Sequence, residues 1–177
     1  DAFPIQEQTI PLGLPGQDII GQAKTGTGKT FGFGIPVVQR LGLDAEHGVK
    51  ALIVVPTREL CVQVYEDIDM LTSGRSTSVV AIYGGKAYEG QIDQLKAGAQ
   101  IVVGTPGRLI DLNNQRLLDL SHATEVVLDE ADKMLDLGFL PDIEKIFSKV
   151  PAIRHTQLFS ATMPGPIVAL ARRFMTN

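Results

Sequence analysis

A glycine-rich segment at residues 22–30, Gln-Ala-Lys-Thr-Gly-Thr-Gly-Lys-Thr, has the residue types and spacing of a phosphate-binding loop. Gly26 and Gly28 allow backbone angles that bring main-chain N–H groups close to phosphate oxygens. Lys29 can place a positive charge on the outer phosphates, and the hydroxyl of Thr30 can ligate magnesium. The segment therefore predicts a site for a nucleotide and its metal ion. The residues expected to bind the nucleotide are Ala23, Lys24, Thr25, Gly26, Thr27, Gly28, Lys29 and Thr30.

The residues on either side of this loop predict a strand before it and a helix after it. Residues 18–21 read as a short buried strand, and apolar residues recur at helical spacing from about residue 29 to 41. Main-chain N–H groups and the helix dipole at such a junction attract phosphate. The usual pattern G-x-x-x-x-G-K-[ST] opens with glycine, whereas here Ala23 stands first, so a glycine-rich surface loop stays open as the alternative.

An acidic pair offers the second half of a nucleotide site. Asp129 and Glu130 directly follow the apolar run 126–128. A carboxylate at a strand end can hold a magnesium ion that bridges phosphates, and a neighbouring carboxylate can orient and deprotonate a water molecule. The pair therefore favours nucleotide hydrolysis over transfer to a small molecule. The alternative is a solvated helix start, where carboxylates suit the helix dipole.

Short apolar runs, mostly rich in β-branched residues, alternate with helical patterns along the chain. They read as strands buried on both faces, which predicts an α/β fold with a parallel sheet covered by helices on both sides. At 177 residues we expect a single domain. The expected strands are 18–21, 51–55, 79–82, 101–103, 126–128 and 158–159, and the clearest helical patterns are Leu60, Val64, Ile68 and Leu71, then Ile143, Ile146 and Phe147.

Prolines, glycines and helix caps modify the elements expected along the chain. Residues 1–17 contain three prolines, which predict an irregular lead-in. Two glycines and a proline weaken the helix at 29–41, where glycine costs about 1 kcal/mol relative to alanine, so packing must override propensity. Thr105, followed by Pro106, is expected to be a better helix cap than Thr57, which has no capping-box partner.

Composition narrows the class of protein. The chain is 44% hydrophobic and 20% charged, and it has no apolar run near the length of a membrane span and no signal peptide at its start, so we expect a soluble protein. Its one cysteine, Cys61, excludes an internal disulfide framework and suggests a reducing, cytoplasmic location, with Cys61 as a core residue. The net charge of -4 argues against binding nucleic acid through a broad basic surface.

The ends of other expected strands carry hydroxyls, glycine pairs and arginines. Such groups hold a sugar-phosphate backbone without reading bases. Each of these features alone is weak evidence for binding, because glycine pairs usually form turns and an isolated arginine is usually an exposed surface charge. Together they predict a backbone-binding row formed by Pro56, Thr57, Arg58, Gly84, Gly85, Thr105, Gly107 and Arg108.

Taken together, these segments resemble the first of the two RecA-like domains of a DEAD-box ATP-dependent RNA helicase, over nearly the whole chain. In that family Ala23 is the ordinary opening of the phosphate loop. The resemblance implies ATP and Mg²⁺ as cofactors, RNA bound by its backbone, and ATP hydrolysis coupled to local duplex unwinding as two domains close. The segments in family order are 23–30, 56–60, 84–85, 105–108, 129–132 and 160–162.

The resemblance also implies roles that the residues alone do not indicate. Gln6, in Pro-Ile-Gln, would bind the adenine edge as the end of a Q motif. Ser160 and Thr162, otherwise only hydroxyls near the sheet edge, would link the metal site to RNA through Asp132. Two further parts would lie outside this sequence: an aromatic residue that stacks on adenine, and the second domain with its arginine finger and further RNA contacts. Protein regulators are further potential partners.

Two other functions stay open at this point. A phosphate-loop kinase or GTPase is disfavoured by Glu130 beside Asp129 and by the lack of an Asn-Lys-x-Asp guanine signature; competition between ATP and GTP would separate the classes. A non-catalytic module that binds only nucleotide or a regulator would show no turnover with or without RNA.

Overall fold

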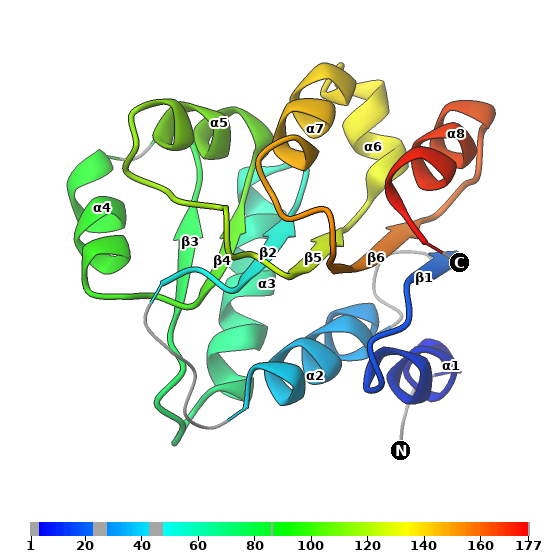
Figure 1. Ribbon diagram of the computed structural model, residues 1–177, viewed down its shortest axis with the longest axis horizontal. Coiled ribbons are helices and arrows are strands. Elements are labelled where there is room, and N and C mark those ends of the chain that lie inside the picture. Colours follow the sequence, from blue (N-terminus) through cyan, green and yellow to red (C-terminus); the bar gives the residue numbers. More distant parts are fainter. Residues whose placement is uncertain (1–3, 23–27, 43–47, 86, 177) are drawn as a thin grey trace.

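The chain folds around a six-stranded sheet, as seen in a computed structural model that describes residues 4–22, 28–42, 48–85 and 87–176 (Figure 1). The strand order is β1-β6-β5-β2-β4-β3, and every neighbouring pair is parallel. The expected parallel α/β architecture is therefore confirmed. The strands are β1 (Ile19–Gln22), β2 (Ala51–Val54), β3 (Val79–Ile82), β4 (Ile101–Gly104), β5 (Glu125–Leu128) and β6 (His155–Ser160).

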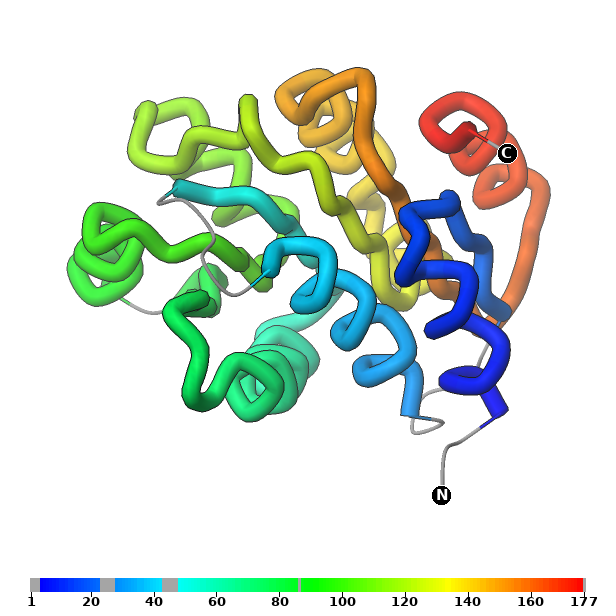
Figure 2. The backbone as a smooth tube through the Cα atoms, turned by 60° about the horizontal axis from the view of Figure 1, so that its bottom comes forward, coloured from blue at the N-terminus to red at the C-terminus, as the bar shows by residue number. Residues whose placement is uncertain are grey.

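Helices cover both faces of the sheet. Alternate residues of each strand point to opposite faces, so each strand contributes side chains to a core on either side. Ile53 of β2 packs in the core under α1, α2 and α3, while its neighbour Leu52 packs in the core under α5 to α8 (Figures 1 and 2). The helices are α1 (Pro4–Gly13), α2 (Lys29–Leu41), α3 (Arg58–Leu71), α4 (Tyr88–Lys96), α5 (Pro106–Asn114), α6 (Ala131–Asp136), α7 (Leu140–Phe147) and α8 (Gly165–Phe174). None of the described helices has the length and apolarity needed to cross a bilayer.

The register of the sheet brings the loops after its strands to one level. Val54 at the end of β2 pairs with Gly104 at the end of β4 and with Leu128 at the end of β5. On the other side of β5, Leu128 pairs with Leu158 of β6, and Ser160 of β6 pairs with Gln22 of β1. Ligands bind at the carboxyl ends of parallel strands, so this edge is where the site must form.

The expectation of an irregular lead-in is wrong, because Pro4–Gly13 form α1. Pro4 is the first helical residue, where a missing N–H costs little, and Pro11 stands in the last turn. Burial decides the outcome: Ile5 and Thr9 are buried, and the Thr9 hydroxyl, which donates to the Ile5 carbonyl at 2.6 Å, also lies 3.3 Å from the Gly32 carbonyl of α2. Tertiary packing thus overrides the local proline signal.

The expected ranking of the two helix caps is also wrong. The Thr57 hydroxyl accepts a hydrogen bond from the Leu60 N–H at 3.2 Å and caps α3. Thr105 precedes α5 in an extended conformation, but its side chain makes no capping hydrogen bond. Pro106 does occupy the first turn, as predicted. A capping box is therefore not needed for Thr57 to satisfy a terminal N–H.

Strand β6 is longer than the two residues expected for it, since it begins at His155. Its first half is polar yet buried, because His155 contacts Glu125 with Nδ1 at 2.8 Å and the Gln17 carbonyl with Nε2 at 2.5 Å. Arg40 of α2 forms an ion pair with the same Glu125 carboxylate. Pairing across three segments makes the burial of His155 and Glu125 compatible with their polarity. The side-chain amide of Gln157 is also buried but has no hydrogen-bond partner among the described residues.

Cys61 behaves as the core residue that composition suggests. It is fully buried, and its thiol donates to the Val103 carbonyl at 3.3 Å. Burial raises the pKa of Cys61 to about 12, so the reactive thiolate is not populated at neutral pH.

Close helix packing explains why α2 contains glycine. A Cβ at Gly34 would lie 2.8 Å from Cδ1 of Ile68 and 3.0 Å from Cδ1 of Leu71, both in α3. We therefore expect Gly34→Ala to lower the free energy of unfolding by about 1–3 kcal/mol through overpacking, despite its better helix propensity. Urea denaturation measures this, with exposed Gln39→Ala as the control expected to change little. A stabilised Gly34→Ala protein would contradict the packing argument.

Candidate functional site

The glycine-rich segment connects β1 to α2, as the sequence predicts. β1 ends at Gln22 and α2 begins at Lys29, while Gly28 precedes the helix with φ 77° and ψ 17°. This left-handed conformation favours glycine. Five of the expected nucleotide-binding residues lie outside the described part of the chain, namely Ala23, Lys24, Thr25, Gly26 and Thr27.

Lys29 reaches from the first turn of α2 to the acidic pair after β5. Its Nζ lies 2.9 Å from Oδ1 of Asp129 and 4.0 Å from Oε2 of Glu130. Lys29 is 4% exposed and Asp129 is fully buried. Buried charges must be paired, and the Lys29 ammonium is the partner of the Asp129 carboxylate. The structure thus joins two segments that are 100 residues apart into one constellation.

The environment of Asp129 suits a divalent cation. Burial raises the pKa of Asp129, and the Lys29 ammonium opposes that rise. Its Oδ2 atom is buried and has no hydrogen-bond partner among the described residues. Those residues contain no group of three or more His, Cys, Asp or Glu that could hold a metal ion. A cation at Asp129 would therefore complete its shell with phosphate and water oxygens, which is how magnesium usually binds. Thr30, the second expected metal ligand, is half-buried at the start of α2.

Glu130 is held in an unusual backbone conformation. It precedes α6 with φ 54° and ψ 52°, in the left-handed region that non-glycine residues rarely occupy. Its side chain makes no capping hydrogen bond to α6, which leaves the carboxylate beside Lys29. Such a conformation costs about 1–3 kcal/mol and is most common at functional sites.

Gln6 lies beside the phosphate loop although it is 22 positions away in sequence. Its Nε2 donates to the Gly28 carbonyl at 3.0 Å. The packing of α1 against α2, in which the Thr9 hydroxyl lies 3.3 Å from the Gly32 carbonyl, fixes this position. The structure therefore places Gln6 beside Gly28 at the start of α2, and its contact with adenine stays a prediction.

Asp132, Ser160 and Thr162 form a continuous hydrogen-bonded link between the loops after β5 and β6. Oδ2 of Asp132 accepts from the Thr162 hydroxyl at 3.0 Å and from its N–H at 3.2 Å. The Ser160 hydroxyl donates to the Thr162 carbonyl at 2.6 Å and accepts from the Asp132 N–H at 3.2 Å. Partial burial acts to raise the pKa of Asp132, but hydrogen bonds, first from Thr162, outweigh it and lower the pKa. The network joins the segment that contains Glu130 to the end of β6.

The predicted backbone-binding row lies around the ends of β2, β3 and β4. Gly84, Gly85 and Gly107 are exposed, whereas Pro56 is buried. The Arg58 guanidinium lies 5.5 Å from the centroid of the Tyr83 ring. A Cβ at Gly85 would lie 3.3 Å from a terminal nitrogen of Arg58, so the glycine leaves room for this arginine.

Three residues that hold the row were missed by the sequence interpretation. The Arg108 guanidinium stacks 4.0 Å from the centroid of the Tyr88 ring and donates to the Gln91 side chain at 3.4 Å. Buried Gln91 donates in turn to the Tyr83 carbonyl at 3.2 Å, beneath Arg58. Gln91 thus contacts both Arg108 and Tyr83, the residue against which Arg58 lies. No periodic or motif signal marks these residues, because their contacts join separate segments.

The DEAD/DEAH box helicase family model matches residues 3–170. The chain is 54% identical to the ATP-dependent RNA helicase CshA of Listeria monocytogenes over 175 residues, 99% of this chain and 34% of that protein. It is 51% identical to the DEAD-box ATP-dependent RNA helicase CshA of Bacillus subtilis over 177 residues, 100% of this chain and 36% of that protein. The chain thus spans about a third of the length of these curated relatives.

Solved structures agree with this likeness. A DEAD box protein from Methanococcus jannaschii matches with a TM-score of 0.93 and 43% identity, over 99% of this chain and 48% of that one. A hypothetical ATP-dependent RNA helicase from Sulfolobus tokodaii matches with a TM-score of 0.91 and 41% identity, over 100% of this chain and 51% of that one. The expected RecA-like fold is confirmed.

Proposed function

Because this chain belongs to the DEAD/DEAH box helicase family, we propose that it is the ATP-binding half of an ATP-dependent RNA helicase, its N-terminal RecA-like domain. The observation that carries the proposal is the constellation of Lys29, Asp129 and Glu130 beside the glycine-rich loop. Family membership also disfavours the alternative of an unrelated phosphate-loop kinase or GTPase. A second RecA-like domain would complete the helicase.

Each residue of the constellation has a distinct role in this proposal. Lys29 turns from Asp129 toward the outer phosphates of ATP, whose charge replaces that of the carboxylate. Thr30 and Asp129 would hold magnesium, which supplies neutralisation of phosphate charge when it is bound. Glu130 orients a water molecule and accepts its proton. Gln6 would bind the adenine edge, which makes ATP the preferred nucleotide.

The row on the β3 and β4 side of the sheet would bind RNA. Arg58 and Arg108 offer charge to phosphates, while the exposed glycines and Thr105 offer main-chain and hydroxyl groups. These groups carry no base preference, so RNA should bind largely independently of sequence. The Asp132 to Thr162 network supports coupling, because it ties the segment after Glu130 to β6. Duplex unwinding follows when the two domains close. A reducing, cytoplasmic location agrees with the buried thiol of Cys61. Protein regulators would be further partners of the helicase.

Nucleotide binding by the purified chain tests the proposal. We expect Lys29→Ala to weaken ATP affinity about 10- to 100-fold, because charge-assisted hydrogen bonds contribute about 1.5–3 kcal/mol. Equilibrium binding of a fluorescent ATP analogue, competed with ATP and with GTP, measures this. ATP should compete better than GTP.

The controls for this test address folding. Lys29→Ala leaves the buried Asp129 carboxylate without its cation, so thermal unfolding must accompany the binding measurement. Lys149→Ala removes an exposed lysine outside the site and should leave affinity unchanged. A folded Lys29→Ala protein with the parent affinity for ATP would overturn the assignment of the phosphate site.

A further inference from the structure

Helix α4, which packs against β3 on the outer side of the sheet, buries a glutamine (Figure 1). Gln91 is 4% exposed and is the only buried residue of this helix, all of whose residues are described. A surface helix normally buries apolar side chains, and a buried polar side chain needs hydrogen-bond partners. The partners of Gln91 therefore indicate what it does.

The side-chain amide of Gln91 joins two segments of the proposed RNA-binding row. Its Nε2 donates to the Tyr83 carbonyl at 3.2 Å, and its Oε1 accepts from a terminal nitrogen of Arg108 at 3.4 Å. The reversed amide would place oxygen against a carbonyl oxygen and N–H against a guanidinium N–H, so both contacts would be repulsive. The two partners thus fix the orientation of the amide, and the amide fixes Tyr83 and Arg108 relative to each other.

The contact with Tyr83 also determines where Arg58 lies. The Tyr83 carbonyl precedes two exposed glycines, of which Gly85 has a left-handed φ of 80°. The Arg58 guanidinium lies 5.5 Å from the centroid of the Tyr83 ring, and a Cβ at Gly85 would lie 3.3 Å from one of its terminal nitrogens. Arg58 is therefore placed against residues 83–85, whose first carbonyl is bonded to Gln91.

Arg108 is held on a second side by an aromatic ring. Its guanidinium lies 4.0 Å from the centroid of the Tyr88 ring. The Tyr88 hydroxyl donates to Asp111, whose other carboxylate oxygen accepts from the Gln115 side chain at 2.9 Å. The ring is thus fixed between α4 and α5, and Arg108 contacts both this ring and the Gln91 amide. A guanidinium that is already ordered loses less side-chain freedom when it binds a phosphate.

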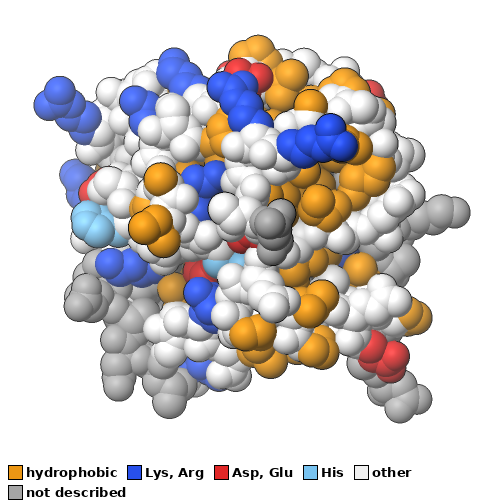
Figure 3. All heavy atoms as spheres, turned by 45° about the vertical axis from the view of Figure 1, so that its right-hand side comes forward, with side chains coloured by type: hydrophobic (Ala, Val, Ile, Leu, Met, Phe, Trp, Pro, Cys, Tyr) orange, Lys and Arg blue, Asp and Glu red, His pale blue; other side chains and the backbone are white. Residues whose placement is uncertain are grey.

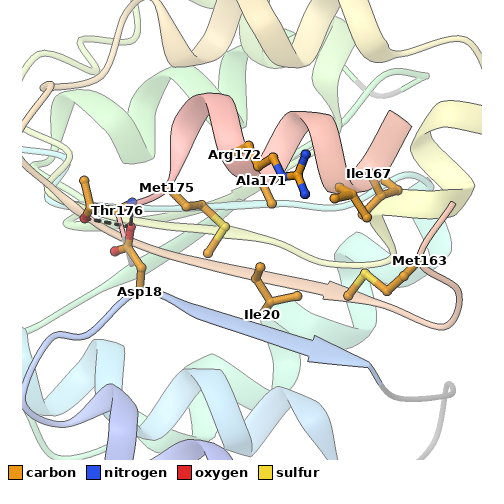
Figure 4. A pocket seen from close by; sticks show the side chains of 9 residues that line it. Asp18, Ile20, Met163, Ile167, Ala171, Arg172, Met175 and Thr176 are labelled. Atoms are coloured by element: carbon orange, nitrogen blue, oxygen red, sulfur yellow. Dashed lines mark hydrogen bonds between the residues drawn. The ribbon is translucent and has the colours of Figure 1, made fainter. Parts of the chain in front are cut away.

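The opposite side of the sheet offers a different kind of surface. A pocket of about 360 Å³ lies there between β1 and α8 (Figure 4). Ile20, Ile167 and Met175 contribute apolar side chains to its lining, and hydrophobic side chains gather on this face of the molecule (Figure 3). A sugar-phosphate backbone binds through charged and hydrogen-bonding groups, so the arginines on the β3 side suit it better.

We propose that Gln91 is a positioning residue that makes Arg58 and Arg108 act together on one RNA backbone. It sets the separation and orientation of the two guanidinium groups before RNA arrives, and such preorganisation raises affinity by lowering the cost of ordering. Gln91 itself does not contact RNA. Its removal should therefore weaken RNA binding only while the arginines are present. This inference rests on the proposed function, because it deepens the RNA-binding site.

The test measures RNA binding by a protein that carries this domain and a second RecA-like domain, with a non-hydrolysable ATP analogue. The probe is a fluorescein-labelled oligouridylate of about ten nucleotides, within the usual site size for single strands. Fluorescence anisotropy at several salt concentrations gives the affinity and its salt dependence, which reports the number of phosphate contacts. Gln91→Met, Arg58→Ala and Arg108→Ala are compared singly and in combination. Gln94→Met, which changes an exposed glutamine of the same helix, is the matched control.

We expect Gln91→Met to weaken RNA binding about 3- to 10-fold through the loss of two hydrogen bonds, and Gln94→Met to bind like the parent. Arg58→Ala and Arg108→Ala should each weaken binding by about tenfold and lower the salt slope by about 1. Gln91→Met should also lower the slope, because a misaligned guanidinium makes a poorer phosphate contact. Its cost should fall when either arginine is absent, and should be less than about twofold when both are absent.

A purely structural role for Gln91 would give a different result. Gln91→Met would then lower the unfolding temperature but leave the RNA affinity of the folded protein and its salt slope unchanged. Thermal unfolding and ATP affinity are therefore measured for every variant. If Gln91→Met does not fold, Gln91→Asn replaces it, because asparagine keeps the amide but is one methylene too short to reach both partners. The same loss of RNA affinity is expected.

The outcomes separate this inference from the proposed function. Folded Gln91 variants with the parent affinity and salt slope, beside weakened arginine variants, would overturn the inference and leave the RNA-binding row intact. An equal cost of Gln91→Met with and without the arginines would also overturn it, since Gln91 would then act elsewhere. Unchanged affinity in both Arg58→Ala and Arg108→Ala would reject the RNA-binding row itself, and the inference with it.

Discussion

Glu130→Gln, in a protein that carries this domain and a second RecA-like domain, is expected to bind ATP normally and to hydrolyse it about 10²- to 10⁴-fold more slowly. Glutamine has the shape of glutamate but cannot accept the proton of an attacking water molecule. The variant also keeps a long side chain at the left-handed position, so the backbone strain at φ 54° should not change. RNA should then stay bound, because release follows hydrolysis.

Single-turnover ATP hydrolysis measures the chemical step, and equilibrium binding of ATP and RNA measures the states before it. Asp136→Asn is a matched control, because it neutralises an exposed carboxylate in the same helix, α6. The control should hydrolyse ATP at the parent rate. If Glu130→Gln does so as well, Glu130 is not the base, and the roles of the two adjacent carboxylates must be reassigned.

The fold was predictable wherever one local signal decided the structure. The helix after the glycine-rich loop runs from Lys29 to Leu41, as its apolar spacing predicts. The strand at residues 79–82 also has its predicted bounds. Both lie against a core that takes their apolar side chains, so the periodic pattern and the tertiary environment agree.

Pairing across the chain, which local sequence does not show, decided the structure at the start of β6 and in α1. The start of β6 is polar, and contacts with Glu125 and Gln17 offset the cost of burying His155. Helix α1 contains prolines, but its packing against Gly32 compensates. Hydrophobic periodicity carries no information about such polar and steric partners, because they are distant in sequence.

The candidate site divides in the same way. Lys29, Asp129 and Glu130 were predicted from residue type and strand position alone, and the structure brings their side chains together. Gln6 and Asp132 were assigned only through the family resemblance, because each acts through a partner in another segment. Gln91, Tyr83 and Tyr88 escaped both approaches, although they support the arginines of the proposed RNA site.

Joining the second RecA-like domain is expected to raise ATP hydrolysis about 10³- to 10⁵-fold over the 177-residue chain alone. The chain should fold and bind adenine nucleotide, because the core, Lys29 and Asp129 lie within it. Binding should be weak, because the aromatic residue expected to stack on adenine is not part of this sequence. The proposed difference comes from an arginine that the second domain supplies to the transferring phosphate, equivalent to about 4–7 kcal/mol of barrier. Arg58 and Arg108 do not replace it, since they lie against Tyr83 and Tyr88 on the β3 side of the sheet.

Strand separation should show a qualitative loss in the same comparison, because unwinding requires a second domain against which this one can close. ATP turnover and separation of a short RNA duplex are measured for both proteins, with and without RNA. The variant that lacks only the arginine finger of the second domain is the control that separates its charge from domain closure. It should lose most of the gain in hydrolysis while it still binds RNA. Comparable activity of the isolated chain would mean that the catalytic constellation is complete around Lys29 and Glu130, and the two-domain proposal would have to be abandoned.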